Sequence, residues 1–357
     1  MSPARKSPST ADSPPESSCL RSCRRRRERA ERVRGDGRYP MPMTPHTRAV
    51  VDAATAAFPK LGTEVLDAAQ ARRQLASRPA APVVPIPVAT VRDSIVPGPG
   101  DVEIPVRVYT PRGGAEPLPV VLFCHGGGFV ICSLDSHDQF CRTMANETGA
   151  LVVSVDYRQA PEHRFPAAAQ DAYAVLCWIG AAIAQYGGDP TRIAVAGDSA
   201  GGNLAAVAAL IARDLGRPAV AAQLLMYPML DPTRAGASYR DNAQGYFVTD
   251  DHLRWYWEQY LGDADGTDPY AAPLLADPAG LPPAHIATAE YDPLRDEGEA
   301  YGAHLAAAGV PVEVHRYEGM FHGFMTMGDV LPETATANER AFAALRRAFA
   351  LRAGSTP

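Results

Sequence analysis

Residues 193–202 read Ile-Ala-Val-Ala-Gly-Asp-Ser-Ala-Gly-Gly and carry a strong local signal for a strand, a turn and a helix. The four apolar residues Ile193–Ala196 predict a short buried strand, and the apolar run after Gly201 predicts a helix. The turn between them carries the pattern G-x-S-x-G, which holds a serine in strained backbone geometry between a strand and a helix. Glycines flank the serine because larger neighbours would collide with the sheet or the helix. The stretch therefore predicts that Ser199 is a nucleophile at the end of a strand.

Short apolar runs alternate with longer helical runs on both sides of this turn. The other runs that predict strands are Val88–Val96, Val102–Tyr109, Val120–Cys124, Leu151–Val155, Ala222–Tyr227, Ala284–Thr288 and Val312–Tyr317. The runs that predict helices are Ser136–Glu147, Ala167–Tyr186, Gly201–Leu215, Arg295–Ala308 and Asn338–Leu351. Strands that alternate with helices indicate a mainly parallel sheet covered by helices on both faces. We therefore expect an α/β fold.

A run of glycines, His-Gly-Gly-Gly at residues 125–128, follows the predicted strand Val120–Cys124 directly. Consecutive glycines let the backbone turn its N–H groups toward a bound oxygen, and such donors stabilise the oxyanion of an acyl-transfer intermediate. We expect the N–H groups of Gly126, Gly127 and Ala200 to form this oxyanion hole. The alternatives are a flexible turn and a phosphate-binding loop. A phosphate loop would end in Lys and Ser or Thr, whereas three apolar residues follow here.

A serine hydroxyl needs a base to accept its proton, and that base needs an acid that orients it. In this architecture the acid and then the histidine follow the serine along the chain. Of the nine histidines, His322 lies in a loop after the last predicted strand, where open α/β sheets place their sites. Asp292 lies in the turn after another strand, just before a proline, and is the preferred acid. Glu290, nearer the end of that strand, is the alternative acid.

Two segments are expected to form a cap over the site. Residues 231–268 form an unusually long connection between two strands, and residues 44–80 include a run of helical spacing with apolar positions from Val50 to Leu66 on one side. The candidate substrate-binding residues of the cap are Tyr246, Phe247, Trp255 and Trp257. As an apolar cover they would favour a modestly hydrophobic substrate. The alternatives are an amphipathic helix packed on the sheet and aromatic residues that form the core of the cap.

Charge is distributed unevenly along the chain. Of the 34 basic and 40 acidic residues, residues 1–40 hold eleven and five, which leaves a body with 23 basic and 35 acidic residues and a net charge of -12. We expect the basic leader to be disordered because it has few apolar residues, or to be absent if translation starts at Met41 or Met43. Residues 41–357 then form a single catalytic domain. The acidic body argues against a nucleic-acid partner.

Membrane, disulfide and metal signals are weak. No window reaches the roughly 18–20 consecutive apolar residues of a membrane span, and residues 204–212 come closest. Six cysteines in a chain of this length do not make a disulfide framework, and Cys19 and Cys23 lack the spacing of a metal knuckle. We therefore expect a reduced, cytoplasmic protein that uses neither a metal nor an organic cofactor.

Four motifs of the chain together resemble the hormone-sensitive-lipase-like esterases, a branch of the α/β-hydrolase superfamily. They are the glycine loop, the serine turn spelled G-D-S-A-G-G, Asp292-Pro293-Leu294 before His322-Gly323-Phe324, and Asp156–Ala168. The last is similar to the D-Y-R-L-A-P-E stretch of that family, with Gln159 in place of the usual Leu. The resemblance covers about residues 44–350. It implies an eight-stranded, mostly parallel sheet with a helical cap.

The resemblance also implies a function. The expected activity is that of a serine carboxylesterase, which hydrolyses short- to medium-chain carboxylic esters through an acyl-enzyme intermediate, with Ser199, His322 and Asp292 as the triad. A homodimer is plausible from the family. The same triad can cleave an activated amide or formamide, or transfer the acyl group to another alcohol. The superfamily also includes ligand receptors that have lost triad members, but here all three are present.

Overall fold

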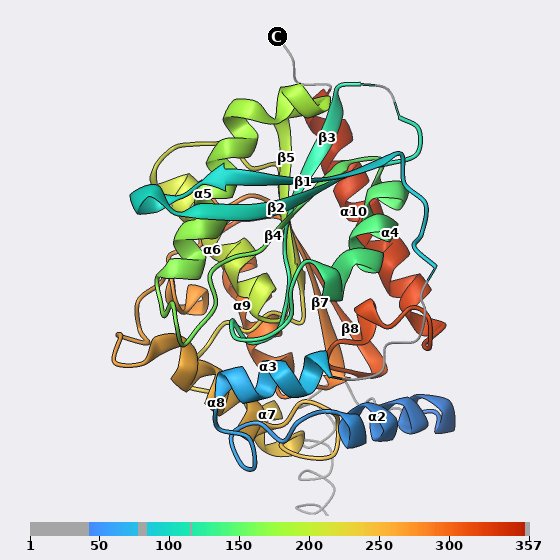
Figure 1. The fold of residues 1–357 in the computed structure, drawn as a ribbon, viewed down its shortest axis with the longest axis vertical. Helices are drawn as coiled ribbons and strands as arrows, with labels where there is room; N and C mark the ends of the chain where they lie inside the picture. Colours follow the sequence, from blue (N-terminus) through green and yellow to red (C-terminus); the bar gives the residue numbers. More distant parts are fainter. Residues whose placement is uncertain (1–42, 78–83, 115, 354–357) are drawn as a thin grey trace, which may run out of the picture. The chain divides into compact units, whose positions relative to one another are not determined.

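An eight-stranded sheet forms the centre of the protein (Figure 1). The computed structural model describes residues 43–77, 84–114 and 116–353, so the basic leader predicted at residues 1–40 lies outside the described residues. The strands are β1 (Thr90–Pro97), β2 (Glu103–Thr110), β3 (Leu118–Cys124), β4 (Leu151–Val155), β5 (Gly188–Asp198), β6 (Ala222–Met226), β7 (Ala284–Tyr291) and β8 (Val312–Phe321). Every predicted strand is present, which confirms the predicted α/β fold.

The strands lie in the order β1-β2-β4-β3-β5-β6-β7-β8. β2 pairs antiparallel with both β1 and β4, and all other neighbours are parallel. The predicted mostly parallel, eight-stranded sheet is therefore confirmed. In the parallel part, the carboxyl ends of β3, β5, β7 and β8 meet at one edge, which is the edge where the sequence places the glycine loop, the serine, the acid and the histidine.

Helices cover both faces of the sheet (Figure 1). One face carries α4 (Asp138–Thr148) and α10 (Glu333–Ala353), and the other carries α5 (Ala167–Ala182), α6 (Ala200–Asp214) and α9 (Arg295–Ala307). The alternation of side chains along a strand explains this layering. Val120 and Leu122 of β3 belong to one apolar core, and Val121 and Phe123 belong to the other. A central strand buried on both faces is therefore apolar at every position.

One helical stretch, Ala167–Tyr186, has the length and composition of a membrane span among the described residues. The sequence instead placed residues 204–212 closest to such a span. The difference arises because α5 continues into a 3₁₀ turn, Ile183–Tyr186, and the combined stretch reaches 20 residues. In the structure Val175 and Ile179 of α5 lie in the core beside the sheet. A helix in a protein core can have the same length and composition as a membrane span.

The N-terminal region expected to form one helical run forms two helices. These are α2 (Pro45–Ala57) and α3 (Ala68–Ala76). The first helix ends because Pro59 disfavours helical geometry in the residue before it, and Phe58 is extended, with φ -83° and ψ 140°. The second helix starts afresh at Asp67, whose side chain accepts the N–H of Gln70. The apolar positions therefore do not share one helix face, and Leu66 is 62% exposed.

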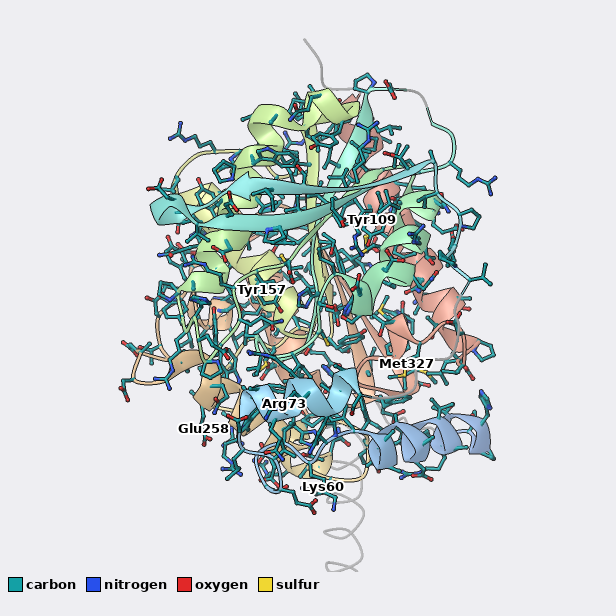
Figure 2. All side chains as sticks on the ribbon, in the orientation of Figure 1. Lys60, Arg73, Tyr109, Tyr157, Glu258 and Met327 are labelled. Carbon is teal, nitrogen blue, oxygen red and sulfur yellow. The ribbon has the colours of Figure 1, made fainter. Side chains whose placement is uncertain are left out.

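The long connection between β6 and β7 contains two further helices, α7 (Ser238–Asp241) and α8 (Asp250–Leu261). They lie with α2 and α3 at one end of the sheet (Figure 1). Figure 2 shows Lys60, Arg73 and Glu258 around this helical end, where each of these side chains is more than half exposed. We call α2, α3, α7 and α8 with their connecting loops the cap.

His252 makes the start of α8 sensitive to acid. Thr249 Oγ accepts the His252 N–H at 3.2 Å, and His252 Nδ1 accepts the Thr249 N–H at 3.4 Å. Nδ1 accepts only when it carries no proton, and burial lowers the pKa of His252 from 6.5 to about 4. The unfolded chain thus binds a proton near pH 6.5 that the folded chain does not. Stability is therefore full above pH 6.5 and falls as the pH drops toward 4.

We predict that His252→Gln removes this part of the pH dependence. Glutamine at the third helical position keeps an acceptor for the Thr249 N–H but does not titrate. Between pH 6.5 and 4, the free energy of unfolding of the wild type should fall by up to about 3 kcal/mol more than that of the variant. Urea unfolding over this pH range measures the difference, and parallel curves for the two proteins would contradict the prediction.

Candidate active site

Ser199 lies on the turn between β5 and α6, with φ 55° and ψ -121°. A non-glycine residue at this positive φ is strained, and the turn around it has to enforce the conformation. A Cβ atom on Gly197 would collide with the carbonyl of Gly201, and a Cβ atom on Gly201 would collide with that of Cys124. The two glycines of the G-x-S-x-G pattern are therefore required, and the turn presents the serine hydroxyl at the carboxyl edge of the sheet.

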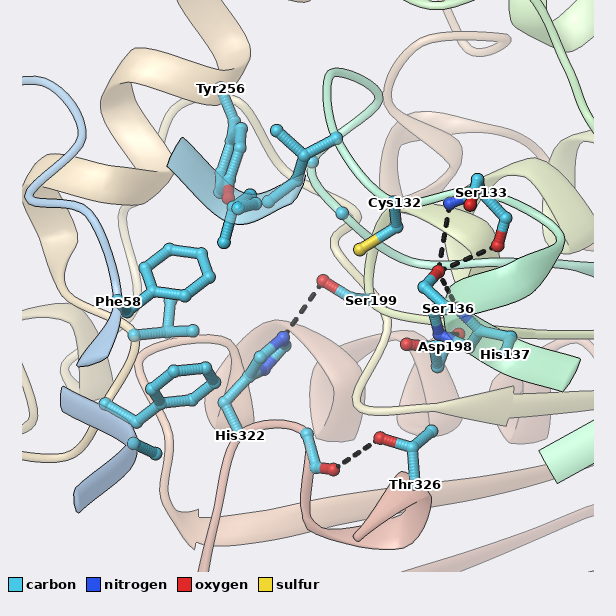
Figure 3. Close-up of a pocket in the computed structure, with 18 of the residues that line it drawn as sticks. Phe58, Cys132, Ser133, Ser136, His137, Asp198, Ser199, Tyr256, His322 and Thr326 are labelled. Carbon is cyan, nitrogen blue, oxygen red and sulfur yellow. Dashed lines mark hydrogen bonds and ion pairs between the residues drawn. The ribbon is translucent and has the colours of Figure 1, made fainter. Parts of the chain in front are cut away.

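Three side chains distant in the sequence form a chain of hydrogen bonds (Figure 3). His322 Nε2 lies 3.0 Å from Ser199 Oγ, and His322 Nδ1 lies 2.8 Å from Asp292 Oδ2. Asp292 follows β7 and His322 follows β8, so the ends of two paired strands bring acid and base together. With the Nδ1 proton directed at the carboxylate, Nε2 is available to accept the proton of the serine.

Glu290, the alternative acid, occupies a different position. Its Oε2 accepts the backbone N–H of Gly319 at 2.6 Å, three residues before His322. Gly319 has φ 73°, a conformation that favours glycine. Asp292 is fully buried, and its second oxygen accepts the Leu294 N–H at 2.9 Å. The geometry therefore gives Asp292 the contact with the imidazole and makes Glu290 a support for the histidine loop.

The glycine loop differs from the expectation at one position. The N–H of Gly126 donates to Asp198 Oδ1 at 2.8 Å, so this donor is occupied and is not available to an oxyanion. Gly127 and Gly128 line the cavity in front of the serine, and within the described residues neither N–H group donates a hydrogen bond. Ala200 begins α6, where the first N–H groups have no partner in the helix. In the described residues, the N–H groups of Gly127, Gly128 and Ala200 are thus the ones left free in front of the serine, whereas that of Gly126 is occupied.

A cavity of about 720 Å³ opens in front of the serine hydroxyl. Its apolar wall comes mainly from the cap and includes Ala54, Phe58, Leu75, Val248, Leu253 and Tyr256. Its polar wall consists of Ser133, Ser136, His137 and Asp198. Figure 3 shows the two walls on opposite sides of Ser199, with Phe58 and Tyr256 on one side and Ser133, Ser136 and His137 on the other. A carbonyl group beside the serine would thus have apolar surface on one side and hydrogen-bonding groups on the other.

A sequence profile for the alpha/beta hydrolase fold matches residues 121–326, which is more than half of the chain. The chain belongs to the α/β-hydrolase family. Carboxylesterase NlhH of Mycobacterium tuberculosis is 45% identical to this hydrolase over 269 residues, 74% of the chain and 84% of the relative. Ethyl acetate hydrolase of Pseudomonas putida is 39% identical over 237 residues, 64% of the chain and 74% of the relative.

A solved structure gives the same result for the fold. The esterase of the archaeon Pyrobaculum calidifontis is 40% identical to the hydrolase and superposes on it with a TM-score of 0.79, covering 86% of this chain and 99% of that one. The comparisons confirm the hormone-sensitive-lipase-like family expected from the four motifs. The relatives carry the names of carboxylic ester hydrolases, which is the activity that the resemblance implied.

Of the four aromatic residues that the sequence proposed for substrate binding, only Phe247 lines the cavity in the described part of the hydrolase. Tyr246 stacks on Tyr291 instead, with ring centroids 4.7 Å apart. Trp255 is buried inside the cap and donates its indole N–H to a backbone carbonyl of the loop between α2 and α3 at 2.9 Å. Trp257 is buried as well. Tyr246, Trp255 and Trp257 therefore pack against other parts of the protein and do not line this cavity.

Two aromatic residues of the cavity were missed by the sequence analysis. Tyr256 lies directly over Gly128, where a Cβ atom would collide with its ring. Phe58 contacts Phe247 edge to face, with ring centroids 5.2 Å apart. Helical spacing could have identified Tyr256, because it lies one turn after Leu253, which lines the same wall. The tryptophans on either side of Tyr256 point in other directions around the helix.

Arg72 of α3 connects the cap of the hydrolase to the glycine loop. Its Nε donates to the Val130 carbonyl at 2.7 Å, and a terminal nitrogen donates to the Ala160 carbonyl at 2.6 Å. The same guanidinium pairs with Glu162 at 2.8 Å. Arg72 also lines the cavity, but these partners hold its charged group in the wall. Ala160 and Glu162 of the family-specific stretch thus help to anchor the cap.

Proposed function

We propose that this α/β-hydrolase is a serine carboxylesterase for short- to medium-chain carboxylic esters. The chain of hydrogen bonds from Ser199 through His322 to Asp292 carries the proposal, because it gives a weak nucleophile its base and gives the base its orienting acid. The relatives named carboxylesterase and ethyl acetate hydrolase support the ester as the substrate class. The apolar cap wall supports a substrate with a hydrocarbon chain.

In the first half of the proposed reaction, Ser199 Oγ attacks the ester carbonyl while His322 Nε2 accepts the hydroxyl proton. Asp292 holds the imidazole and stabilises the imidazolium that forms. The negative charge on the former carbonyl oxygen is received by the N–H groups of Gly127, Gly128 and Ala200. When the tetrahedral intermediate collapses, the bond to the alcohol breaks, and His322 gives the alcohol its proton.

In the second half, a water molecule takes the place of the alcohol. His322 accepts a proton from the water as its oxygen attacks the acyl carbon, and the same donors receive the oxyanion again. The acid then leaves and the proton returns to Ser199. This mechanism uses neither a metal nor an organic cofactor. Within the described residues, no group of three or more His, Cys, Asp or Glu side chains could hold a metal ion.

The chain-length profile tests the proposed substrate class. The cavity of about 720 Å³ lies within the usual range for a small-molecule site and has to hold both the acyl chain and the alcohol. We predict high kcat/KM for p-nitrophenyl acetate, butyrate and hexanoate, and a steep fall beyond about ten acyl carbons. A profile that rises steadily to the palmitate ester would contradict the proposal.

Three measurements separate the ester hydrolase from its rivals. Turnover of p-nitrophenyl butyrate beside that of the matched p-nitroanilide distinguishes an esterase from an amidase. Addition of butanol distinguishes hydrolysis from acyl transfer, because a transferase would form butyl butyrate in preference to butyric acid. A receptor without activity would fail to react with a fluorophosphonate at Ser199.

We further propose a cytoplasmic homodimer that has no nucleic-acid partner. The free thiols of Cys124, Cys132, Cys141 and Cys177 are in keeping with a reducing compartment. The dimer rests on the family resemblance. Light scattering of the purified protein tests it, and a mass of one chain at micromolar concentration would contradict it.

A further inference from the structure

The polar wall of the cavity contains a second pair of histidine and aspartate (Figure 3). His137 Nε2 lies 3.2 Å from Asp198 Oδ1, and the same oxygen accepts the N–H of Gly126 at 2.8 Å. On its other side, His137 Nδ1 lies 2.9 Å from Ser136 Oγ, which donates to the Ser133 carbonyl at 2.7 Å. All of these side chains lie outside the triad, and none of them takes part in the proposed reaction.

Both ring nitrogens of His137 have partners within hydrogen-bond distance. Ser136 Oγ accepts the N–H of Ser133 at 2.9 Å and donates to the Ser133 carbonyl at 2.7 Å, and it lies 2.9 Å from His137 Nδ1. Nε2 faces Asp198, and an ionised carboxylate only accepts. Burial raises the pKa of the Asp198 carboxyl, but His137 and the Gly126 N–H outweigh burial and keep this pKa below its ordinary value. Asp198 is therefore a carboxylate held by the Gly126 N–H and by His137.

The position of this pair gives it a consequence for catalysis. Asp198 directly precedes the nucleophile, and Gly126 directly precedes the two glycines that line the cavity. A Cβ atom on Gly126 would collide with the carboxylate, so only glycine lets the backbone come this close. Gly127 and Gly128 follow with φ 110° and 60°. The contact with Asp198 thus sets where the loop begins, and the next two residues are the free donors.

We propose that Asp198 and His137 are positioning residues for the oxyanion hole. Asp198 holds the first glycine of the loop in place, so that the N–H groups of Gly127 and Gly128 meet the oxyanion that forms at Ser199. His137 contacts the same carboxylate oxygen from another side and so keeps it directed at the Gly126 N–H. The inference rests on the proposed function, because an oxyanion forms only if Ser199 attacks a carbonyl.

Four variants separate positioning from general structural support. Asp198→Ala removes the acceptor for the Gly126 N–H, whereas Asp198→Asn keeps an oxygen there. His137→Ala removes the side-chain partner of the buried carboxylate, whereas His137→Gln keeps a donor there. Each variant is titrated with a fluorophosphonate so that rates refer to intact active sites. The measurements are kcat and KM for p-nitrophenyl butyrate and the inhibition constant of a trifluoromethyl ketone, whose adduct with Ser199 carries an oxyanion.

We expect Asp198→Ala to lower kcat about 100-fold and to change KM less than about threefold. The reason is that the displaced N–H donors stabilise the oxyanion of the transition state and not the bound substrate. The ketone should bind more weakly by a similar factor. The kcat of Asp198→Asn should stay within about tenfold of the wild-type value, and the kcat of His137→Gln should exceed that of His137→Ala. If Asp198→Ala yields no folded protein, the kcat values and ketone affinities of the other three variants test the inference.

A buried carboxylate elsewhere provides the matched control. Asp171 is fully buried and ion-paired with Arg158, outside the cavity. Asp171→Asn should lower thermal stability and leave kcat and the ketone affinity of the active sites unchanged. The inference would be overturned if Asp198→Ala bound the ketone as tightly as the wild type does. It would also be overturned if KM rose by the same factor by which the ketone affinity fell. The proposed function fails separately, if the wild type itself neither hydrolyses the ester nor reacts with the fluorophosphonate.

Discussion

Replacement of Ser199 by alanine is expected to abolish ester hydrolysis and to leave the fold intact. The hydroxyl is the group that lies within hydrogen-bond distance of His322 Nε2, and the variant has no oxygen to attack the substrate. From the loss of the serine in other triads, kcat should fall by roughly 10⁶-fold. Hydrolysis of p-nitrophenyl butyrate measures the loss, and circular dichroism shows whether the protein remains folded.

Ser94→Ala is the matched control for this substitution. Ser94 lies on β1, and its hydroxyl accepts the hydrogen bond of Tyr186 far from the cavity. This variant should keep wild-type turnover and still react with a fluorophosphonate, which Ser199→Ala should not. Turnover of Ser199→Ala close to that of the wild type would rule out this serine as the nucleophile.

Asp292→Asn is expected to have the second largest effect, a fall in kcat of up to about 10⁴-fold. The carboxylate accepts from His322 Nδ1 at 2.8 Å and thereby directs the free electron pair of Nε2 at the serine. An amide at this position can donate to Nδ1, which favours the tautomer with its proton on Nε2. That tautomer is unable to accept the proton of the serine. The KM of p-nitrophenyl butyrate should change far less than kcat.

Glu290→Gln is the comparison that tests the choice of acid. The amide oxygen can still accept the N–H of Gly319, so the histidine loop keeps its anchor. We expect kcat to stay within about tenfold of the wild type. If Glu290→Gln were the damaging change and Asp292→Asn the mild one, the assignment of the acid would be wrong.

The strands and the chemical groups of the site could be predicted from the sequence because their signals are local. Ile193–Ala196 is an apolar run that ends in a turn of fixed spelling, and the order of nucleophile, acid and base along the chain limits the choice of partners. Pro59 is also a local signal, since the residue before a proline disfavours helical geometry, and it marks the break between α2 and α3.

The details that were missed depend on contacts between distant residues. Gly126 looked like an oxyanion donor because its neighbours in sequence are glycines, but its N–H meets a carboxylate 72 positions away. Trp255 and Trp257 stood out by residue type, whereas the cavity receives Tyr256 because of the direction in which α8 faces. Such orientations follow from packing, which spacing alone does not define.

The order of the triad along the chain has a consequence for the synthesis of the protein. Ser199 meets a base that lies 123 positions later, on the loop that follows the last strand of the sheet. During translation the N-terminal part of a domain emerges first, so the serine and the glycine loop exist long before their histidine. The nascent chain therefore holds a serine without a base and stays chemically inert. We therefore expect activity to begin only after β8 has joined the sheet and brought His322 to the serine.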